Sequence, residues 1–405
     1  MSIEQPTSSE YLRKILLTPV YDVARVTPLE HMEKLSERIG CRVCLKREDL
    51  QPVHSFKLRG AYYKISQLSE EQKKAGIIAC SAGNHAQGVA LAATRQGVKS
   101  VVCMPDSAPI SKVESTKRLG AEVVLTKGAY DDAYLKALEL QKETGATLIH
   151  PFDDDLVIAG QGTVGLEILD EMPDIDAVIV PIGGGGLISG VAFAIKSLRP
   201  SIKVYGVQAA NAPSMYESRK QGEQITLASV STFADGIAVK HPGDTTFKMV
   251  QDYVDDIVTV SEDEIAAAIL AMIEKQKLVS EGAGAVAVAA AMFGKLPIKG
   301  KKVACLVSGG NIDVNILSRV ITRGLVTSGR MATLLVALDD KPGQLVRVCD
   351  TISGCGANIT SVRHERSDPN MAIASCYVRI NVETRNFDHI EEIKVALADA
   401  GYRTI

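Results

Sequence analysis

Apolar residues in this chain gather in short runs that alternate with longer stretches of helical periodicity. In the stretch 261–278, for example, apolar side chains recur with the spacing of one helix face, and Ser261 with Glu264 forms a capping box at its start. The short runs are rich in β-branched residues, and we predict that they are strands: Ile77–Cys80, Val101–Met104, Glu122–Leu125, Ala177–Pro181, Val204–Gln208, Ile257–Val260 and Val303–Val307. This repetition of strand and helix predicts open α/β sheets.

The pattern changes near residues 322–330, where polar residues and glycines interrupt it, and we place a domain boundary there. The segment that follows, 331–405, has the order strand, helix, strand, strand, helix, strand. Its expected elements are Met331–Leu338, Gln344–Ser353, Asn358–Arg363, Ala372–Val382, Phe387–Ala400 and Tyr402–Ile405. This βαββαβ order is that of a ferredoxin-like domain.

Length and charge narrow the class of protein. A chain of 405 residues exceeds the size of one hydrophobic core, so it should contain two or more domains. Its 45 basic and 48 acidic residues give a net charge of −3, which favours small ligands over nucleic acid or an anionic membrane. Residues 1–6 lack the pattern of a signal peptide, and no apolar run reaches the roughly 18 residues of a membrane span. We therefore expect a cytoplasmic protein.

The eight cysteines lie mostly in apolar runs, where free cysteine acts as a small hydrophobe, so structural disulfides are not expected. Cys41 and Cys44 form a C-x-x-C pair in a segment that looks like a strand. No second pair follows, and we expect no metal or redox site there.

Glycine-rich loops follow three of the predicted strands. Ile77–Cys80 leads into residues 81–85, Ala177–Pro181 into Gly183–Gly186, and Val303–Val307 into residues 308–311. In open α/β sheets, ligands bind just beyond the carboxyl ends of the strands. We therefore expect the three loops to lie on one sheet edge and to converge on one pocket.

Four consecutive glycines allow backbone N–H groups to approach an anion, and the following helix adds its positive end. Gly183–Gly186 is therefore a candidate phosphate site, with a tight turn that only needs small residues as the alternative. Neither the dinucleotide fingerprint G-x-G-x-x-G nor the P-loop motif can be placed here, which argues against NAD and ATP.

Lys57 lies between Phe56 and a glycine-containing turn. In a partly desolvated pocket a lysine amine loses its proton and can form a Schiff base with the aldehyde of pyridoxal phosphate; a solvated surface charge is the alternative. Asn84 suits a ring hydroxyl or a substrate carboxylate, whereas Ser308 suits a ring nitrogen or a helix cap. His85 belongs either to an anion-binding loop or to the packed interior.

In this combination the chain resembles the threonine dehydratase (threonine ammonia-lyase) family, in the fold type II group of pyridoxal-phosphate enzymes. The matching segments are 55–61, 81–88, 183–187, 234–236, 281–285 and 308–311. The resemblance implies an α/β catalytic domain over 1–325, with two lobes of open α/β sheets of the tryptophan synthase β-like kind. The smaller lobe would cover roughly 52–153.

The resemblance also implies a role for each matched residue. Lys57 would hold pyridoxal phosphate as a Schiff base and then remove the Cα proton of the substrate. Phe56 would pack on the cofactor ring, Asn84 would bond the ring hydroxyl, and Ser308 would bond the ring nitrogen. Further cofactor contacts would be Gly183, Gly184, Gly185, Gly186, Leu187, Gly236 and Glu281, and substrate contacts would be Ser81, Ala82, Gly83, Asn84 and His85.

The implied reaction is a β-elimination in amino-acid metabolism. Isoleucine biosynthesis is the expected role, and a catabolic role is the alternative. It would convert L-threonine to 2-oxobutanoate and ammonia, and L-serine to pyruvate. A neutral hydroxyl at the ring nitrogen, supplied by Ser308, favours elimination. The related serine racemases have a second acid, a serine, where this chain has Ala82, which disfavours racemisation. In those racemases a cation is bound by one carboxylate at the position that Gln208 occupies in this chain and by another near the position of Ser214. Because Gln208 is not a carboxylate, no metal is expected here.

Two alternatives stay open from the sequence. Within the same group, the chain would be a serine dehydratase or a racemase-like enzyme. From another class, it would be an amino-acid sensor whose catalytic part has decayed.

The tail, 331–405, resembles an ACT domain, an amino-acid-sensing module, through residues 340–345 and 357–359. The resemblance implies allosteric regulation and side-by-side pairing of these modules in a homo-oligomer, a dimer or a tetramer. The effector, an amino acid for which isoleucine with valine as antagonist is our expectation, would be bound by Gly343, Gln344, Leu345, Asn358 and Ile359. A module for stability or assembly without a ligand is the alternative.

Overall fold

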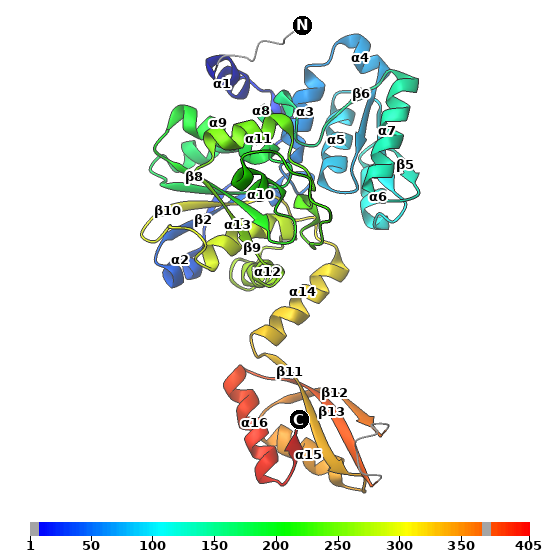
Figure 1. The fold of residues 1–405 in the computed structure, drawn as a ribbon, viewed down its shortest axis with the longest axis vertical. Helices are drawn as coiled ribbons and strands as arrows, with labels where there is room; N and C mark the ends of the chain where they lie inside the picture. Colours follow the sequence, from blue (N-terminus) through cyan, green and yellow to red (C-terminus); the bar gives the residue numbers. More distant parts are fainter. Residues whose placement is uncertain (1–7, 367–373) are drawn as a thin grey trace. The chain divides into compact units, whose positions relative to one another are not determined.

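The computed structural model describes residues 8–366 and 374–405, and the chain divides into two units, Met1–Asp313 and Val314–Ile405 (Figure 1). The expectation about residues 1–6 lies outside the described residues. The second unit begins earlier than predicted, because helix α14 (Val314–Thr327) belongs to it and contacts strand β11 (Met331–Asp339). Residues 322–324, expected to interrupt the pattern, therefore lie inside a helix.

Six strands of the first unit form one sheet. Their order across it is β1 (Leu29–His31), β2 (Arg42–Arg47), β10 (Lys302–Val307), β7 (Ala177–Pro181), β8 (Lys203–Ala209) and β9 (Asp256–Val260). β1 runs antiparallel to β2, and the other neighbours are parallel. The segment at Cys41–Cys44 does contribute a strand, β2, as its pattern indicates.

The remaining four strands form a second, wholly parallel sheet. Their order is β5 (Glu122–Thr126), β4 (Ser100–Pro105), β3 (Ile77–Cys80) and β6 (Thr147–Leu148). All the predicted strands of this unit are confirmed, but one expectation is wrong. β3 lies in this sheet while β7 and β10 lie in the larger one, so the three glycine loops do not leave a single sheet edge. A buried apolar run specifies a strand without specifying its partner.

Helices connect the strands of the first unit (Figure 1). They are α1 (Ser8–Leu16), α2 (Glu33–Ile39), α3 (Lys57–Ser66), α4 (Glu70–Ala75), α5 (Asn84–Arg95), α6 (Ile110–Arg118), α7 (Tyr130–Thr144), α8 (Asp155–Glu171), α9 (Gly186–Leu198), α10 (Ser214–Gln221), α11 (Asp244–Tyr253), α12 (Glu262–Gln276) and α13 (Gly282–Met292), with short 3-10 turns η1 (Val20–Asp22), η2 (Glu48–Leu50) and η3 (Asp235–Ile237). The predicted capping box is confirmed, because Ser261 and Glu264 exchange both hydrogen bonds at the start of α12.

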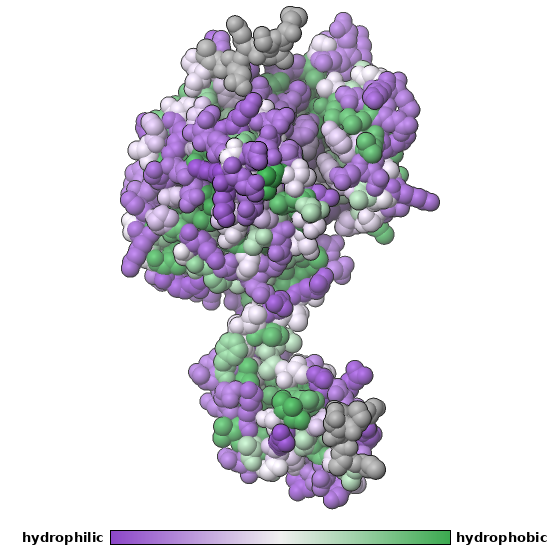
Figure 2. All heavy atoms as spheres, in the orientation of Figure 1, coloured by the Kyte–Doolittle hydropathy of each residue, from purple (hydrophilic) through white to green (hydrophobic). Residues whose placement is uncertain are grey.

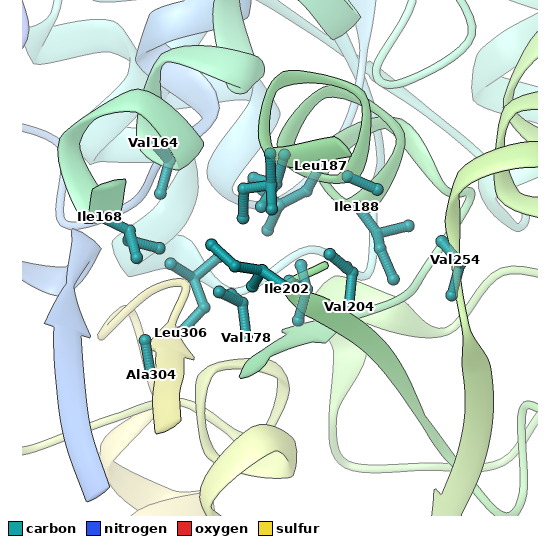
Figure 3. Packing of buried hydrophobic residues seen from close by; sticks show 14 of the residues in the cluster. Val164, Ile168, Val178, Leu187, Ile188, Ile202, Val204, Val254, Ala304 and Leu306 are labelled. Atoms are coloured by element: carbon teal, nitrogen blue, oxygen red, sulfur yellow. The ribbon is translucent and has the colours of Figure 1, made fainter. Parts of the chain in front are cut away.

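The core of the larger sheet is packed by α8 and α9. Figure 3 shows Val164 and Ile168 of α8 and Ile188 of α9 gathered over the strand residues Val178 and Leu306, and all five are fully buried. Complete burial of one such side chain stabilises the fold by about 1.5–3 kcal/mol relative to exposure. This packing fixes α9, whose first residues follow the glycine loop.

Two glycine contacts bring α3, α8 and α9 close together. A Cβ at Gly160 of α8 would stand 2.7 Å from the Cα of Gly60 in α3, and a Cβ at Gly190 of α9 would stand 2.7 Å from the amide nitrogen of Gly162 in α8. Real Cβ atoms do not approach so closely, so glycine is required where these helices touch. α8 therefore joins the helix that begins at Lys57 to the helix that follows the glycine loop.

The second unit has the predicted ferredoxin-like topology. Its sheet has the order β12 (Asn358–Glu365), β13 (Ser375–Glu383), β11 and β14 (Arg403–Thr404), with every neighbour antiparallel, and its helices are α15 (Gln344–Gly354) and α16 (Phe387–Asp399). Alternate residues of β11 and β13, including Val336 and Val378, pack with Val348 and Ile393 of the helices. Residues 372 and 373 of one predicted strand lie outside the described residues.

In the described part of the chain, no helix combines the length and apolar character needed to cross a bilayer. Figure 2 shows hydrophilic side chains over much of the visible face of each unit. All eight cysteines are free thiols.

Candidate active site

Lys57 is the first residue of α3, and its amine points back towards the loop after β6. The Nζ atom donates a hydrogen bond to the carbonyl of Pro151 at 2.7 Å and lies 5.4 Å from the centre of the Phe56 ring. Burial lowers the pKa of Lys57 from 10.5 to about 8, although the negative charge of Glu281 opposes this shift. A substantial fraction of this amine is therefore unprotonated in mildly basic solution, as a nucleophile or base requires.

The chain around Lys57 is tied to the loop after β10. Ser55 forms an antiparallel bridge with Gly309, and the Phe56 amide donates to the carbonyl of Ser308 at 3.2 Å. The Oγ atom of Ser308 makes no hydrogen bond to a described residue, so this hydroxyl remains available to a ligand. The structure thus places the segment that carries Lys57 next to Ser308.

A buried ion network anchors the first turn of α3. The guanidinium of Arg59, fully buried, donates two bonds of 2.8 Å to the Glu48 carboxylate and one of 2.5 Å to Glu167. Breaking such a pair by removing one partner typically costs about 3–5 kcal/mol, because it leaves a buried charge uncompensated. Arg59 therefore fixes the helix that presents Lys57.

The glycine loop forms a row of free backbone donors. The amides of residues 183–187 make no hydrogen bond to a described residue, and Gly185 has a φ of +100° at the start of α9. Free amides at a helix N-terminus, with the positive end of the helix behind them, bind anions such as a phosphate. The Leu187 side chain packs in the core (Figure 3), so only its backbone can contribute to this site.

The loop has no room for side chains on its Phe152 side. A Cβ at Gly186 would lie 2.7 Å from the Phe152 carbonyl oxygen and 2.9 Å from its Cα. Because backbone atoms cannot yield as a flexible side chain can, we predict that Gly186→Ala destabilises the protein by about 1–3 kcal/mol and displaces the free amides. Titration with pyridoxal phosphate, followed by absorbance, should show weakened binding. Gly354→Ala is the matched control, since that position has open space and an ordinary φ; equal affinity of both variants would contradict the prediction.

Asn84 is held at both ends of its side-chain amide. Its Nδ2 donates to Glu281 Oε1 at 2.6 Å, and its Oδ1 accepts a bond of 2.8 Å from Asn311 Nδ2. Asn311 also donates to the carbonyl of Val53 at 2.8 Å. The loop after β3 therefore meets the loop after β10 across the two sheets, and the orientation of Asn84 is fixed before any ligand binds.

Glu281, the N-cap of α13, is a buried carboxyl group beside Asn84. A Cβ at Gly236 would lie 3.5 Å from its Oε1, and a Cβ at Gly309 would collide with the same oxygen at 2.5 Å. Burial, with the charge of Asp235 adding to it, raises the pKa of Glu281 from 4.5 to about 7. The predicted residues Gly236 and Glu281 therefore do border one site with Asn84, and Glu281 holds a proton at neutral pH more readily than an exposed acid does.

The raised pKa of Glu281 predicts a pH dependence of stability. In the cofactor-free protein the folded state binds this proton more tightly than the unfolded state, so stability decreases as pH rises from 4.5 to 7. Glu281→Gln removes this loss. We expect the free energy of unfolding of the variant, relative to the original chain, to increase by up to about 3 kcal/mol over this window and to stay level above it.

Denaturant unfolding at several pH values measures this difference. His85 titrates in both proteins, and its contribution cancels when the two curves are subtracted. A difference that does not change between pH 4.5 and 7 would contradict the pKa of Glu281.

The loop from Ser81 to His85 offers backbone groups more than side chains. Ser81 Oγ accepts from the amide of Gly83 at 3.1 Å, and the first-turn amides of α5 have no acceptor within their own helix. His85 Nε2 bonds the carbonyl of Ile149 at 2.9 Å, and burial lowers the pKa of this ring to about 3, so it is neutral. The side chain of His85 is therefore structural, and Ala82 packs beside an apolar cluster.

Sequence reasoning missed several residues of the site. Asp153 accepts three bonds of 3.0–3.1 Å from the amides at the start of α11, and Thr246 Oγ1 donates to the Gly184 carbonyl at 2.6 Å. With Pro151, Phe152 and Asn311, they support Lys57, the glycine loop and Asn84. The local sequence signal here is a run of three acidic residues after Pro151 and Phe152. Such a run does not predict contacts with residues far along the chain.

The site combines a lysine of lowered pKa, a row of free amides at a helix N-terminus, a fixed asparagine and a free serine hydroxyl. A protein-family model for "Pyridoxal-phosphate dependent enzyme" matches residues 20–309. The chain belongs to this family of pyridoxal-phosphate dependent enzymes. It is 50% identical to the L-threonine ammonia-lyase of Thermotoga maritima, over 94% of this chain and 95% of that relative. It is 41% identical to the biosynthetic L-threonine dehydratase of Escherichia coli, over 99% and 77% respectively.

Solved structures agree with this family. The processed form of threonine deaminase isoform 2 from Solanum lycopersicum has a TM-score of 0.76 and 45% identity, covering 78% of this chain and 93% of that one. Maize serine racemase has a TM-score of 0.73 and 36% identity, covering 78% of this chain and 98% of the racemase. These likenesses confirm that the first unit has the α/β fold of a pyridoxal-phosphate enzyme.

Proposed function

We propose that this chain is a threonine ammonia-lyase, which converts L-threonine to 2-oxobutanoate and ammonia and acts on L-serine in the same way. The observation that carries the proposal is the 50% identity to the L-threonine ammonia-lyase of Thermotoga maritima along 94% of this chain. Relatives called biosynthetic support a biosynthetic role, which we assign to isoleucine formation. A cytoplasmic location fits the free state of all eight cysteines.

The residues present fit pyridoxal phosphate. When bound, this cofactor supplies an aldehyde that condenses with amines and a ring that withdraws electrons from the substrate Cα. Residues 183–187 would hold its phosphate through their free amides, and Asn84 would meet the ring hydroxyl. The amine of Lys57, deprotonated more readily than usual, takes the proton from the substrate Cα. The first-turn amides of α5 would bind the substrate carboxylate.

Ser308 and Ala82 favour elimination over racemisation. The hydroxyl of Ser308 is neutral and does not stabilise a charged ring nitrogen, which favours loss of the substrate hydroxyl. Ala82 offers no proton to the opposite face of Cα. With L-serine we therefore expect pyruvate to exceed D-serine by a wide margin, and Ala82→Ser to increase D-serine formation. Chiral chromatography with a pyruvate assay measures both products; D-serine as the main product of the unmodified chain would favour a racemase.

We assign catalysis to the first unit, with a small lobe over roughly 52–153, and regulation to the second unit as an ACT-type domain. Its βαββαβ topology supports this assignment. Gly343, with a φ of +85°, leads into α15, so Gly343, Gln344 and Leu345 lie at a helix N-terminus that suits an amino-acid carboxylate. The Gln344 amide already donates to the Lys341 carbonyl at 3.4 Å, which leaves the amides of Gly343 and Leu345 as the donors. Asn358 and Ile359 begin β12 and would complete the effector site from a neighbouring copy in a dimer or tetramer.

A non-catalytic amino-acid sensor is less well supported. Lys57, Asn84 and Ser308 are brought together around free backbone donors, and decay of catalysis would not preserve this arrangement. Isoleucine as inhibitor and valine as its antagonist remain our expectation for the effector.

A further inference from the structure

Three potential metal ligands lie together at one end of the second unit. Asp340 follows β11, His364 lies on β12 and Cys376 lies on β13. Leu338 pairs with Cys376 and His364 pairs with Val378, so Cys376 and His364 lie on the same face of neighbouring strands, and Asp340 lies just beyond the end of β11, two residues after Leu338. They come from separate parts of the sequence, which is why no metal-binding spacing can be read along the chain.

The distances and residue types suit a transition metal. One oxygen of Asp340, one ring nitrogen of His364 and the sulfur of Cys376 all lie within 4.8 Å of one another. Tetrahedral Zn²⁺ needs its ligand atoms about 3.3–3.8 Å apart, given bonds of about 2.0–2.3 Å. The change required is about 1 Å, and the exposed side chains of Asp340 and His364 can supply it by small rotations.

Cys376 anchors the group, because its side chain is only 1% exposed and is fixed by the core of the unit. The ring of His364 makes no hydrogen bond to a described residue, so both nitrogens can be ligands. The thiol loses its proton to solvent when a metal binds, and the resulting thiolate and carboxylate together neutralise a divalent ion.

Arg366 would compete with a metal ion for the carboxylate of Asp340. Its guanidinium donates to both oxygens of Asp340, at 2.7 and 3.0 Å. This ion pair is exposed, and such pairs are worth only about 0–1 kcal/mol. A carboxylate has about four acceptor positions, so one oxygen can bind a metal while Arg366 keeps the other.

We propose that Asp340, His364 and Cys376 form a binding site for a divalent transition-metal ion such as Zn²⁺, with three protein ligands and one position open to water. A soft thiolate, an imidazole and a carboxylate select this class of ion over Mg²⁺ or Ca²⁺. The site belongs to the second unit, whereas Lys57 belongs to the first, and the proposal does not depend on the proposed reaction.

The test is titration of the full chain, loaded with pyridoxal phosphate and freed of metal, with Co²⁺ as a coloured substitute for Zn²⁺. We expect one equivalent to produce a thiolate-to-cobalt charge-transfer band and the visible bands of tetrahedral cobalt, both reversed by Zn²⁺. Cys376→Ala should abolish the charge-transfer band. His364→Ala, at an exposed position, should weaken Co²⁺ binding by about 100-fold or more. Even the loss of a residue that only hydrogen-bonds to a metal ligand lowers metal affinity by about 10–100-fold, and His364 is a proposed ligand itself.

Two control variants change residues of the same types outside the site. Asp339→Asn changes the neighbouring acid, and Cys349→Ala removes a cysteine of α15; both should bind Co²⁺ as the unmodified chain does. Mg²⁺ should not compete. The proposal is overturned if no charge-transfer band develops, or if His364→Ala binds Co²⁺ with unchanged affinity, because the cluster is then an Asp340–Arg366 ion pair beside an unrelated cysteine.

Discussion

Replacing Lys57 with alanine should remove both the visible absorbance of the lysine-bound cofactor and the release of 2-oxobutanoate from L-threonine. The amine of Lys57 is held against the Pro151 carbonyl, and burial lowers its pKa to about 8. Loss of a general base alone typically costs about 10²–10⁴-fold in rate, and loss of the covalent attachment adds to this. Absorbance spectra and a keto-acid assay on the same sample measure both effects.

Lys64→Ala is the matched control for this experiment. Lys64 lies on the same helix as Lys57, and its amine pairs with Asp154 at 2.6 Å. We expect its removal to cost some stability while cofactor absorbance and turnover stay unchanged. A Lys57→Ala protein that still binds the cofactor covalently and still releases 2-oxobutanoate would show that another group performs the reaction.

Removal of the second unit should separate catalysis from regulation. In the full chain we expect isoleucine to raise the apparent KM for L-threonine by about 5–150-fold, the usual range of allosteric coupling. A chain that ends at Asp313 should turn over L-threonine without this response, because the Lys57 site lies wholly in the first unit. The first unit has hydrophobic clusters of its own, which supports folding of such a fragment. Initial rates with and without isoleucine measure the effect.

A point variant in the full chain makes the same test without truncation. Asn358→Ala removes a proposed effector ligand whose side chain bonds Glu383 at 2.9 Å on the exposed surface, so the fold should tolerate the change. Thr360→Ala, two residues along β12, is the control and should keep the isoleucine response. A truncated chain that isoleucine still inhibits would place the effector in the first unit.

Much of the fold could be predicted from local patterns. Strands β3 and β7 were predicted to the residue, because each is a short apolar run buried on both faces. The assignment of strands to sheets could not be predicted. β2 pairs with β10 across most of the first unit, and such pairing depends on how the whole chain packs. β6, with two residues, was too short to give a signal.

Some residues of the candidate site could also be predicted from the sequence, and others could not. Lys57, Asn84 and Ser308 could be proposed because their residue types and neighbouring glycines indicate chemistry, and the structure does bring them together. Phe152 could not, because its role comes from its contact with Gly186. Asn311 belongs to the predicted loop 308–311, but its bond to Asn84, far away in the sequence, could not be predicted. The pKa of Glu281 also needed the structure, since burial causes it.

Incubation of the cofactor-loaded full chain with L-threonine tests the central claim most directly. Simultaneous assays for keto acid and ammonia should find 2-oxobutanoate and ammonia in equal amounts, with loss of the substrate matching both. A cofactor-loaded protein that leaves L-threonine unchanged, or that yields D-threonine or allo-threonine in place of the keto acid, would contradict it.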